Sequence, residues 1–209
     1  MTGARVEIEE YAWDRLQSED GRPHDHAFAR RGQEVRTTVM TVDTAGGAER
    51  AWVVSGIRDL VVLMSAGSEF RGFYTDQYTT LPETDDRILA TQLVARWRYA
   101  AAERDWAASH AGIRSALLSA FADTHSRALQ QTLAAMGTAA LTAYPEVAEI
   151  RFSAPNKHHF EVDLTPFGLD NPGQVFYAAD RPYGLIEAVV TRDDAPDPGL
   201  AWSAVPGFT

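Results

Sequence analysis

Residues 86–99 read DRILATQLVARWRY, and the rest of the chain is most easily understood outward from them. The odd-numbered positions carry mostly aliphatic and aromatic side chains, whereas the even-numbered positions include Gln92, Arg96 and Arg98. A period of two is typical of a β-strand with one face toward a core. We therefore expect a strand whose core-facing side chains are Leu89, Thr91, Leu93, Ala95, Trp97 and Tyr99.

Two helices are expected after this strand. Residues 105–121 place apolar side chains at helical spacing, and Asp105 is a candidate cap at the start. Residues 126–144 repeat this pattern, and Pro145 ends the second helix because proline has no amide hydrogen to donate. The expected apolar stripes are Trp106, Ile113, Leu117, Leu118 and Phe121 in the first helix, and Leu129, Leu133, Met136, Ala140, Leu141 and Tyr144 in the second.

Strands are expected on both sides of the helix pair. The segments with strand character are residues 57–64, 147–153, 158–164 and 184–191. Antiparallel strands with helices inserted between them predict an α+β fold, in which an antiparallel sheet carries both helices on one face. Pro196 and Pro198 then predict a loose C-terminal tail.

The N-terminal segment predicts a β-hairpin without helices of its own. Residues 5–13 alternate polar and apolar side chains, residues 19–23 have turn composition, and residues 24–42 form a long strand. The expected buried face of that strand is Val35, Thr37, Val39 and Thr41. We interpret the hairpin as the end of a unit similar to the one that follows, whose first half is absent. The expected division is a partial first unit (1–52), a complete second unit (53–192) and a tail (193–209).

Composition predicts a globular protein and argues against some partners. Apolar residues make up 45% of the 209 residues and charged residues 23%, which is ordinary for a globular domain. A net charge of −10 argues against nucleic acid as a partner, although a local positive pocket for a small anion stays compatible with it. The chain has no cysteine, no visible secretion signal and no long apolar run, so we expect no membrane association and a cytoplasmic location.

Four segments carry a resemblance to a known family. They are VEIEEYAWDRL (6–16) with HDHAF (24–28), SEFRGF (68–73) with DQYTTLPE (76–83) and DRILAT (86–91), LQQTL (129–133), and PNKHHFEVDL (155–164) with DRPYG (180–184). Each segment alone is a weak signal, but the ordered set covers nearly the whole chain. Together the segments resemble urate oxidases (uricases).

The resemblance implies both a fold and an activity. Urate oxidases are built from tandem tunnelling-fold (T-fold) units, each an antiparallel sheet backed by helices. They form homotetramers that enclose a tunnel, with active sites between subunits. They oxidise urate with dioxygen and water to 5-hydroxyisourate and hydrogen peroxide, without a metal or an organic cofactor. A homo-oligomeric oxidoreductase of urate degradation, with urate and dioxygen as substrates, is what the resemblance implies here.

The resemblance assigns two substrate-binding positions to polar side chains. Arg87 matches the arginine whose guanidinium binds a carbonyl and an adjacent ring nitrogen of urate; without the resemblance, an ion pair with Asp85 or Asp86 would be preferred. Gln130 matches the glutamine whose amide binds the opposite edge of the purine. Its neighbour Gln131 is expected to be an ordinary exposed glutamine.

Two further positions follow from the same resemblance. Phe70 matches the aromatic residue that stacks on the purine, with a core phenylalanine as the alternative. Leu129 is expected to contribute its backbone to substrate binding beside Gln130.

Asn156 and His158 complete the set of implied site residues. Asn156 is expected to contact the substrate and to hold the peroxide or water position, and His158 is expected to belong to a proton relay with a lysine and a threonine. His159 is expected to be structural, as are His24 and His26, because an i, i+2 pair without a third ligand is a weak metal signal.

The family's relay lysine and threonine are expected to lie outside this chain, in the first half of the first unit. Lys157 is the only lysine, and its position is not that of the relay base. Three interpretations stay open: one part of an enzyme completed by a separate N-terminal fragment, an inactive truncated form, or a repurposed purine-binding T-fold subunit. Zinc-dependent pterin-synthesising T-fold enzymes are a further alternative, disfavoured because the chain has no cysteine and no plausible histidine triad.

Overall fold

The computed structural model describes residues 2–102, 105–179, 184–203 and 205. Residues 180–183 of the last family-like segment therefore lie outside the described residues. The elements are β1 (Gly3–Gln17), β2 (Pro23–Asp43), β3 (Arg50–Met64), β4 (Leu89–Tyr99), α1 (Trp106–Asp123), α2 (Leu129–Ala143), β5 (Val147–Pro155), β6 (His159–Glu161), the 3-10 turn η1 (Thr165–Phe167), β7 (Phe176–Ala178) and β8 (Leu185–Thr191).

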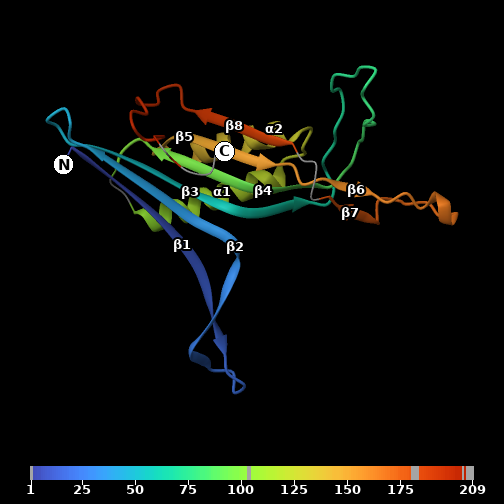
Figure 1. Cartoon of the computed structure of the whole chain (residues 1–209), viewed down its shortest axis with the longest axis horizontal. Helices are drawn as coiled ribbons and strands as arrows, with labels where there is room; N and C mark the ends of the chain where they lie inside the picture. The colour runs from blue at the N-terminus through green and yellow to red at the C-terminus, as the bar shows by residue number, and fades with distance from the viewer. Residues whose placement is uncertain (1, 103–104, 180–183, 204, 206–209) are drawn as a thin grey trace.

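One antiparallel sheet organises the molecule. Its six strands follow the order β1-β2-β3-β4-β5-β8, and β6 pairs with β7 in a separate two-stranded sheet. Both helices lie on one face of the large sheet (Figure 1). The predicted α+β architecture is confirmed. Among the described elements, no helix has the length and apolar character needed to cross a membrane.

The main core lies between this sheet face and the helix pair. Leu89, Leu93 and Trp97 on β4 are fully buried against Ile113, Leu117, Leu133 and Met136 of the helices. Burying one such side chain stabilises the fold by about 1.5–3 kcal/mol. The predicted cap on α1 is confirmed, since the Asp105 carboxylate accepts hydrogen bonds from the amides of residues 107 and 108, at 3.1 and 3.0 Å.

The N-terminal hairpin is continuous with this sheet. β1 and β2 pair from Gly3 opposite Asp43 to Gln17 opposite Pro23, and the hairpin tip extends beyond the other strands (Figure 1). β2 in turn pairs with β3 across the predicted boundary at residue 52. Val35, Thr37, Val39 and Thr41 are buried, as expected. The division into two units at this boundary stays a prediction.

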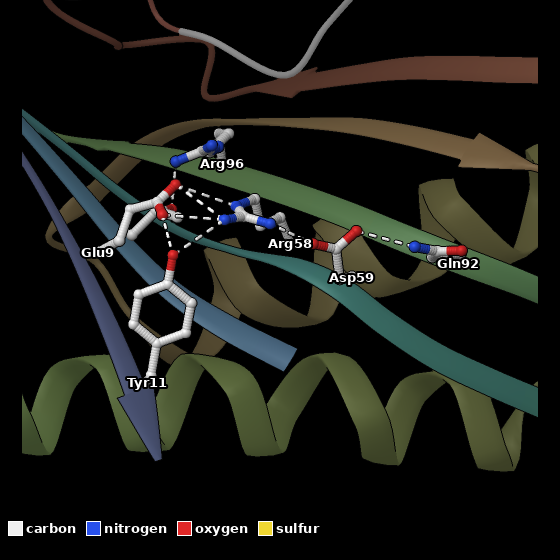
Figure 2. A network of polar contacts seen from close by, with 7 residues as sticks. Glu9, Tyr11, Arg58, Asp59, Gln92 and Arg96 are labelled. Carbon is white, nitrogen blue, oxygen red and sulfur yellow. Dashed lines mark hydrogen bonds and ion pairs between the residues drawn. The ribbon is translucent and has the colours of Figure 1, made fainter. Parts of the chain in front are cut away.

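A polar network ties the hairpin to the middle of the sheet (Figure 2). Arg58 of β3 donates hydrogen bonds to both carboxylate oxygens of Glu9 on β1, at 2.9 and 3.0 Å, and also pairs with Asp59. Asp59 lies at a register shift between β3 and β4 and has φ 60°, a conformation that aspartate tolerates better than most residues. The Gln92 amide of β4 donates to Asp59 at 2.8 Å. The network therefore links β1, β3 and β4.

The described part of the C-terminal tail packs against the sheet, contrary to the loose tail predicted from its prolines. Arg98 of β4 donates to the carbonyl oxygen of Pro196 at 2.9 Å, and the Arg151 guanidinium lies 4.0 Å from the ring centroid of Trp202. Ala201 is buried. The tail covers side chains of β4 and β5 because an arginine that is buried in a sheet needs nearby acceptors.

The predicted strand at residues 158–164 was too long. β6 ends at Glu161 because the Asp163 carboxylate accepts hydrogen bonds from the amide and the hydroxyl of Thr165, which begins the η1 turn. The strand β7 lies between the segments 158–164 and 184–191, where no strand was expected. Its partner is β6, and this pairing, which local composition does not reveal, supports the short strand.

Candidate functional site

A cavity of about 660 Å³ lies where three connecting segments meet. These segments are the β3–β4 connection (65–88), the β5–β6 connection (156–158) and the β6–β7 sheet, and they project from the same end of the large sheet (Figure 1). The lining residues are Ser65, Phe70, Leu81, Pro82, Thr84, Asp86, Arg87, Ile88, Asn156, His158, His159, Phe160, Glu161, Pro172, Gly173 and Phe176.

Phe70 and Arg87 form one wall of this cavity. Phe70 and Thr84 exchange two backbone hydrogen bonds, of 2.9 and 3.1 Å, which hold the aromatic residue beside the strand that follows. The Arg87 guanidinium carbon lies 5.0 Å from the centroid of the Phe70 ring. The ring of Phe73 stacks on Phe70 at 4.6 Å between centroids. A flat aromatic surface and a cation are thus presented together.

The Arg87 guanidinium carries a charge that no described carboxylate neutralises. Its expected alternative partners are engaged elsewhere, since Asp85 pairs with Arg71 and Asp86 accepts the amide of Gly67 at 2.8 Å. The Arg87 Nε atom is buried and has no hydrogen-bond partner among the described residues. Burial lowers the pKa of Arg87 from its ordinary value. A partly buried guanidinium without a carboxylate partner favours binding of an anion or a carbonyl acceptor.

Asn156 and His158 line the same cavity from the segment between β5 and β6. The Asn156 amide donates to the carbonyl of Gly184 at 2.9 Å, and the Lys157 amide donates to the carbonyl of Ala90 at 2.8 Å. These two backbone bonds hold the segment between β4 and the entry to β8. Arg87 lies three residues before Ala90 in the sequence. The bond from Lys157 to Ala90 therefore also sets the position of Asn156 and His158 relative to Arg87.

His158 lies in a setting that favours its neutral form. Its ring stacks on that of Phe160, with 5.6 Å between centroids. Burial, together with the positive charge of Arg87, lowers the pKa of His158 below its ordinary value of 6.5. At neutral pH the imidazole is therefore mostly neutral and has a nitrogen free to accept a proton.

Leu129 and Gln130 lie at the first turn of α2 and are not among the lining residues. The Leu129 side chain is buried in the core, and Gln130 is exposed. Gln131 is exposed, as expected, and its side-chain oxygen accepts the amide of Arg127 at 2.8 Å. The structure therefore brings together four of the six predicted site residues: Phe70, Arg87, Asn156 and His158.

Several lining residues were not predicted. His159, which was expected to be structural, also lines the cavity, and its Nδ1 atom lies 3.0 Å from the Lys157 carbonyl oxygen. Phe160 and Phe176 reach the site through pairing of β6 with β7. No strand was expected at β7, so the contribution of Phe176 depended on the tertiary structure.

Metal-binding groups are not gathered in the part of the chain that the structure describes. There, no cluster of three or more His, Asp or Glu side chains has the arrangement to hold a metal ion. The rings of His24 and His26 contact each other edge to face, with 5.2 Å between centroids.

Comparison with protein families gives a clear match. The uricase family model matches residues 53–187. The uricase of Arthrobacter globiformis is 53% identical over 208 residues, which cover 100% of this chain and 66% of the relative. The uricase of Emericella nidulans is 37% identical over 206 residues, covering 90% of this chain and 66% of the relative. The chain thus spans just under two thirds of the length of these relatives.

Solved structures give the same result for the fold. The crystal structure of uricase from Arthrobacter globiformis superposes with a TM-score of 0.85 at 53% identity, covering 93% of this chain and 65% of that chain. A uricase from Bacillus fastidious superposes with a TM-score of 0.77 at 27% identity, covering 93% of this chain and 63% of that chain.

Proposed function

The chain belongs to the uricase family, and we propose that it carries the urate-binding part of a cofactor-free urate oxidase. Its α+β architecture is the T-fold that the resemblance implied. The proposed reaction converts urate, dioxygen and water to 5-hydroxyisourate and hydrogen peroxide. The observation that carries the proposal is the unpaired Arg87 guanidinium beside Phe70, in a cavity that also contains Asn156 and His158.

Arg87 and Phe70 are suited to a flat oxypurine anion. A guanidinium offers parallel donors in one plane, which match a carbonyl oxygen and a neighbouring ring nitrogen, and its charge favours the deprotonated purine. The Phe70 ring provides a stacking surface worth about 0.5–1.5 kcal/mol beyond simple burial. Urate supplies the electrons of the reaction, so the protein needs to orient it and move protons.

Asn156 and His158 are proposed to serve the oxygen side of the reaction. The Asn156 amide would hold the water or peroxide next to the purine ring. His158 would accept and return protons, because it is mostly neutral at neutral pH, owing to burial and the Arg87 charge. Both side chains belong to a segment anchored by backbone hydrogen bonds, which limits the conformational entropy that is lost on binding.

Leu129 and Gln130 are proposed to bind the far edge of the purine. The amides of a helix's first turn have no acceptor within the helix, so the Leu129 amide is available to a ligand oxygen. The exposed Gln130 amide offers one donor and one acceptor. They are not among the lining residues, so they would contact a ligand that extends from Arg87 toward α2.

We propose that a further segment completes the site and covers the hairpin. The chain spans 66% of its relatives' length, and the resemblance assigns the relay lysine and threonine to the remainder. Val6, Ile8 and Met40 are about half exposed and, with Val53 and Trp106, line an apolar cavity of about 490 Å³. Within the described residues β1 pairs only with β2, so its outer edge is open to pairing. The tetramer and the cytoplasmic location expected from the sequence stay predictions.

The proposal is tested by urate binding and turnover. Residues 1–209 would be assayed alone and together with the N-terminal third of the Arthrobacter globiformis uricase. We expect anaerobic urate binding, and urate-dependent hydrogen peroxide formation in the presence of the companion fragment. Arg87→Gln should weaken urate binding about 10–100-fold, because a charged hydrogen-bonding group is lost. Arg22→Gln, at an exposed arginine of the hairpin turn away from the cavity, is the matched control and should bind as the parent does.

The outcomes separate the alternatives. Absence of urate binding with and without the companion fragment would refute the proposal. Urate binding that depends on Arg87, without turnover in either sample, would support an inactive or repurposed purine-binding subunit in place of an oxidase.

A further inference from the structure

Two buried hydroxyl groups lie at the start of α2. The Thr132 hydroxyl donates a hydrogen bond of 2.8 Å to the Ser126 hydroxyl, and both residues are fully buried. Ser126 precedes the helix, and Thr132 lies on its first turn, close to Leu129 and Gln130. The hydroxyl pair thus joins the segment before α2 to its first turn, which carries the two residues proposed to bind the purine edge.

The same serine is joined to the connection that carries Phe70. The Glu69 amide donates to the Ser126 carbonyl at 2.8 Å, and the Ser126 amide donates to the Gly67 carbonyl at 3.0 Å. Ser68 and Ser126 form a parallel bridge, and Ser68 is also fully buried. A continuous series of bonds therefore runs from Thr132 through Ser126 to the residue next to Phe70.

Other contacts at this junction are exposed and weaker. The Glu69 carboxylate lies 3.7 Å from both Arg127 and His125, whose side chains are mostly exposed, and such surface ion pairs contribute little. The N-cap residue Ala128 makes no side-chain cap, and Gln131 accepts the Arg127 amide instead. The Ser126–Thr132 bond is the buried contact of the junction, and it resists competition from water.

We propose that Ser126 and Thr132 are positioning residues that fix Gln130 and the Leu129 amide relative to Phe70. The inference rests on the proposed function. Neither hydroxyl touches a ligand, because both are enclosed by protein; they act through the backbone on each side. This arrangement joins the start of α2, which carries Leu129 and Gln130, to the connection that carries Phe70.

The test compares three threonine variants of residues 1–209, together with the companion fragment. Thr132→Val keeps the shape of the side chain and removes the donor, whereas Thr132→Ser keeps the donor. Thr138→Val makes the same change at an exposed threonine of α2 and is the matched control. Amide hydrogen exchange reports the order of the junction, and anaerobic titration with urate reports binding.

Loss of the hydroxyl donor should act locally. We expect Thr132→Val to raise exchange at the Glu69 and Ser126 amides about tenfold, to leave β4 and β5 unchanged, and to weaken urate binding by about 5–10-fold. Thr132→Ser should restore both quantities at least in part, and Thr138→Val should match the parent protein in both.

Two results would overturn the inference. One is an exchange result in Thr132→Val that is not local to the junction. Exchange at Glu69 and Ser126 would then be either unchanged or increased equally throughout the sheet, and the equal increase would indicate a merely structural role. The other is faster exchange at the junction with unaltered urate affinity. If the parent protein binds no urate, the proposed function fails, whereas the exchange data still show whether the hydroxyl pair orders the junction.

Discussion

Arg87 is a partly buried cation, and its charge affects the protonation of a neighbouring histidine. Desolvation disfavours the charged guanidinium, yet its pKa begins so high that the group stays charged at neutral pH. The charge acts on His158 across the cavity and lowers the pKa of that imidazole. A proton acceptor and an anion-binding group are therefore coupled before any ligand arrives.

A first prediction concerns this coupling. Arg87→Gln should raise the pKa of His158 toward, but not fully to, its ordinary value of 6.5, because burial continues to lower it. The shift is measurable by NMR titration of the imidazole carbon-bound protons. Arg87→Lys keeps the positive charge and should give a smaller change. A His158 titration that is the same in Arg87→Gln and in the parent would show that the two groups do not interact.

At the scale of the elements, α1 contains a histidine buried against the sheet. His110 is 7% exposed, its Nε2 atom lies 3.3 Å from the Gly56 carbonyl oxygen, and its ring lies 5.2 Å from that of Trp97. Burial and, second, the charge of Arg36 lower the pKa of His110, whereas Gly56 and the carboxylates of Glu34 and Glu10 act in the opposite direction. The neutral imidazole is the form that fits this helix–sheet contact.

A second prediction follows from the direction of that shift. Because the pKa of His110 is lower in the folded than in the unfolded state, its contribution to stability is complete above pH ~6.5 and is lost as pH falls through the folded pKa. Urea unfolding at pH 7.5, 6.5 and 5.5 should show a falling free energy of unfolding. The fall should be smaller in His110→Gln, whereas His26→Gln, at an exposed position of β2, should behave as the parent.

At the scale of the whole molecule, the two faces of the sheet are covered differently. The helix pair covers one face, while the tail covers part of β3, β4 and β5 on the other. The register places Thr37, Gly56 and Arg96 side by side on this second face, and Arg96 donates to the Thr37 hydroxyl. On this face Arg96 has an acceptor in the sheet, and Arg98 has one in the tail.

A third prediction tests the role of the tail. Ending the chain after Ala195 removes the Pro196 carbonyl from Arg98 and the Trp202 ring from Arg151. We expect a loss of about 1–3 kcal/mol in the free energy of unfolding, because a buried charged donor loses its acceptor. Urea denaturation measures this loss. Trp202→Leu retains the Pro196 contact and should lose less, so equal losses in the two variants would assign the effect to Trp202 alone.

Sequence patterns were most informative where one local rule controls the outcome. The alternation along β4 correctly separated Trp97 and Leu93 from Arg96, and Asp105 correctly marked the start of α1. Four residues of the family-like segments line one cavity, and their role in substrate binding stays a prediction. The same patterns failed for the tail and for β7, where contacts with distant residues outweigh local composition.

Local periodicity and turn chemistry were therefore sufficient for the strands of the large sheet, the helix pair and the α+β class, because both kinds of pattern depend on neighbours within a few residues. The folded chain alone established that Arg87 has no carboxylate partner among the residues that the structure describes. It also established that Phe70 is held beside it through Thr84, and that the hydroxyl of Thr132 reaches Ser126. The reason is that such contacts depend on strand register and on backbone bonds between residues far apart in the sequence, which no single segment encodes.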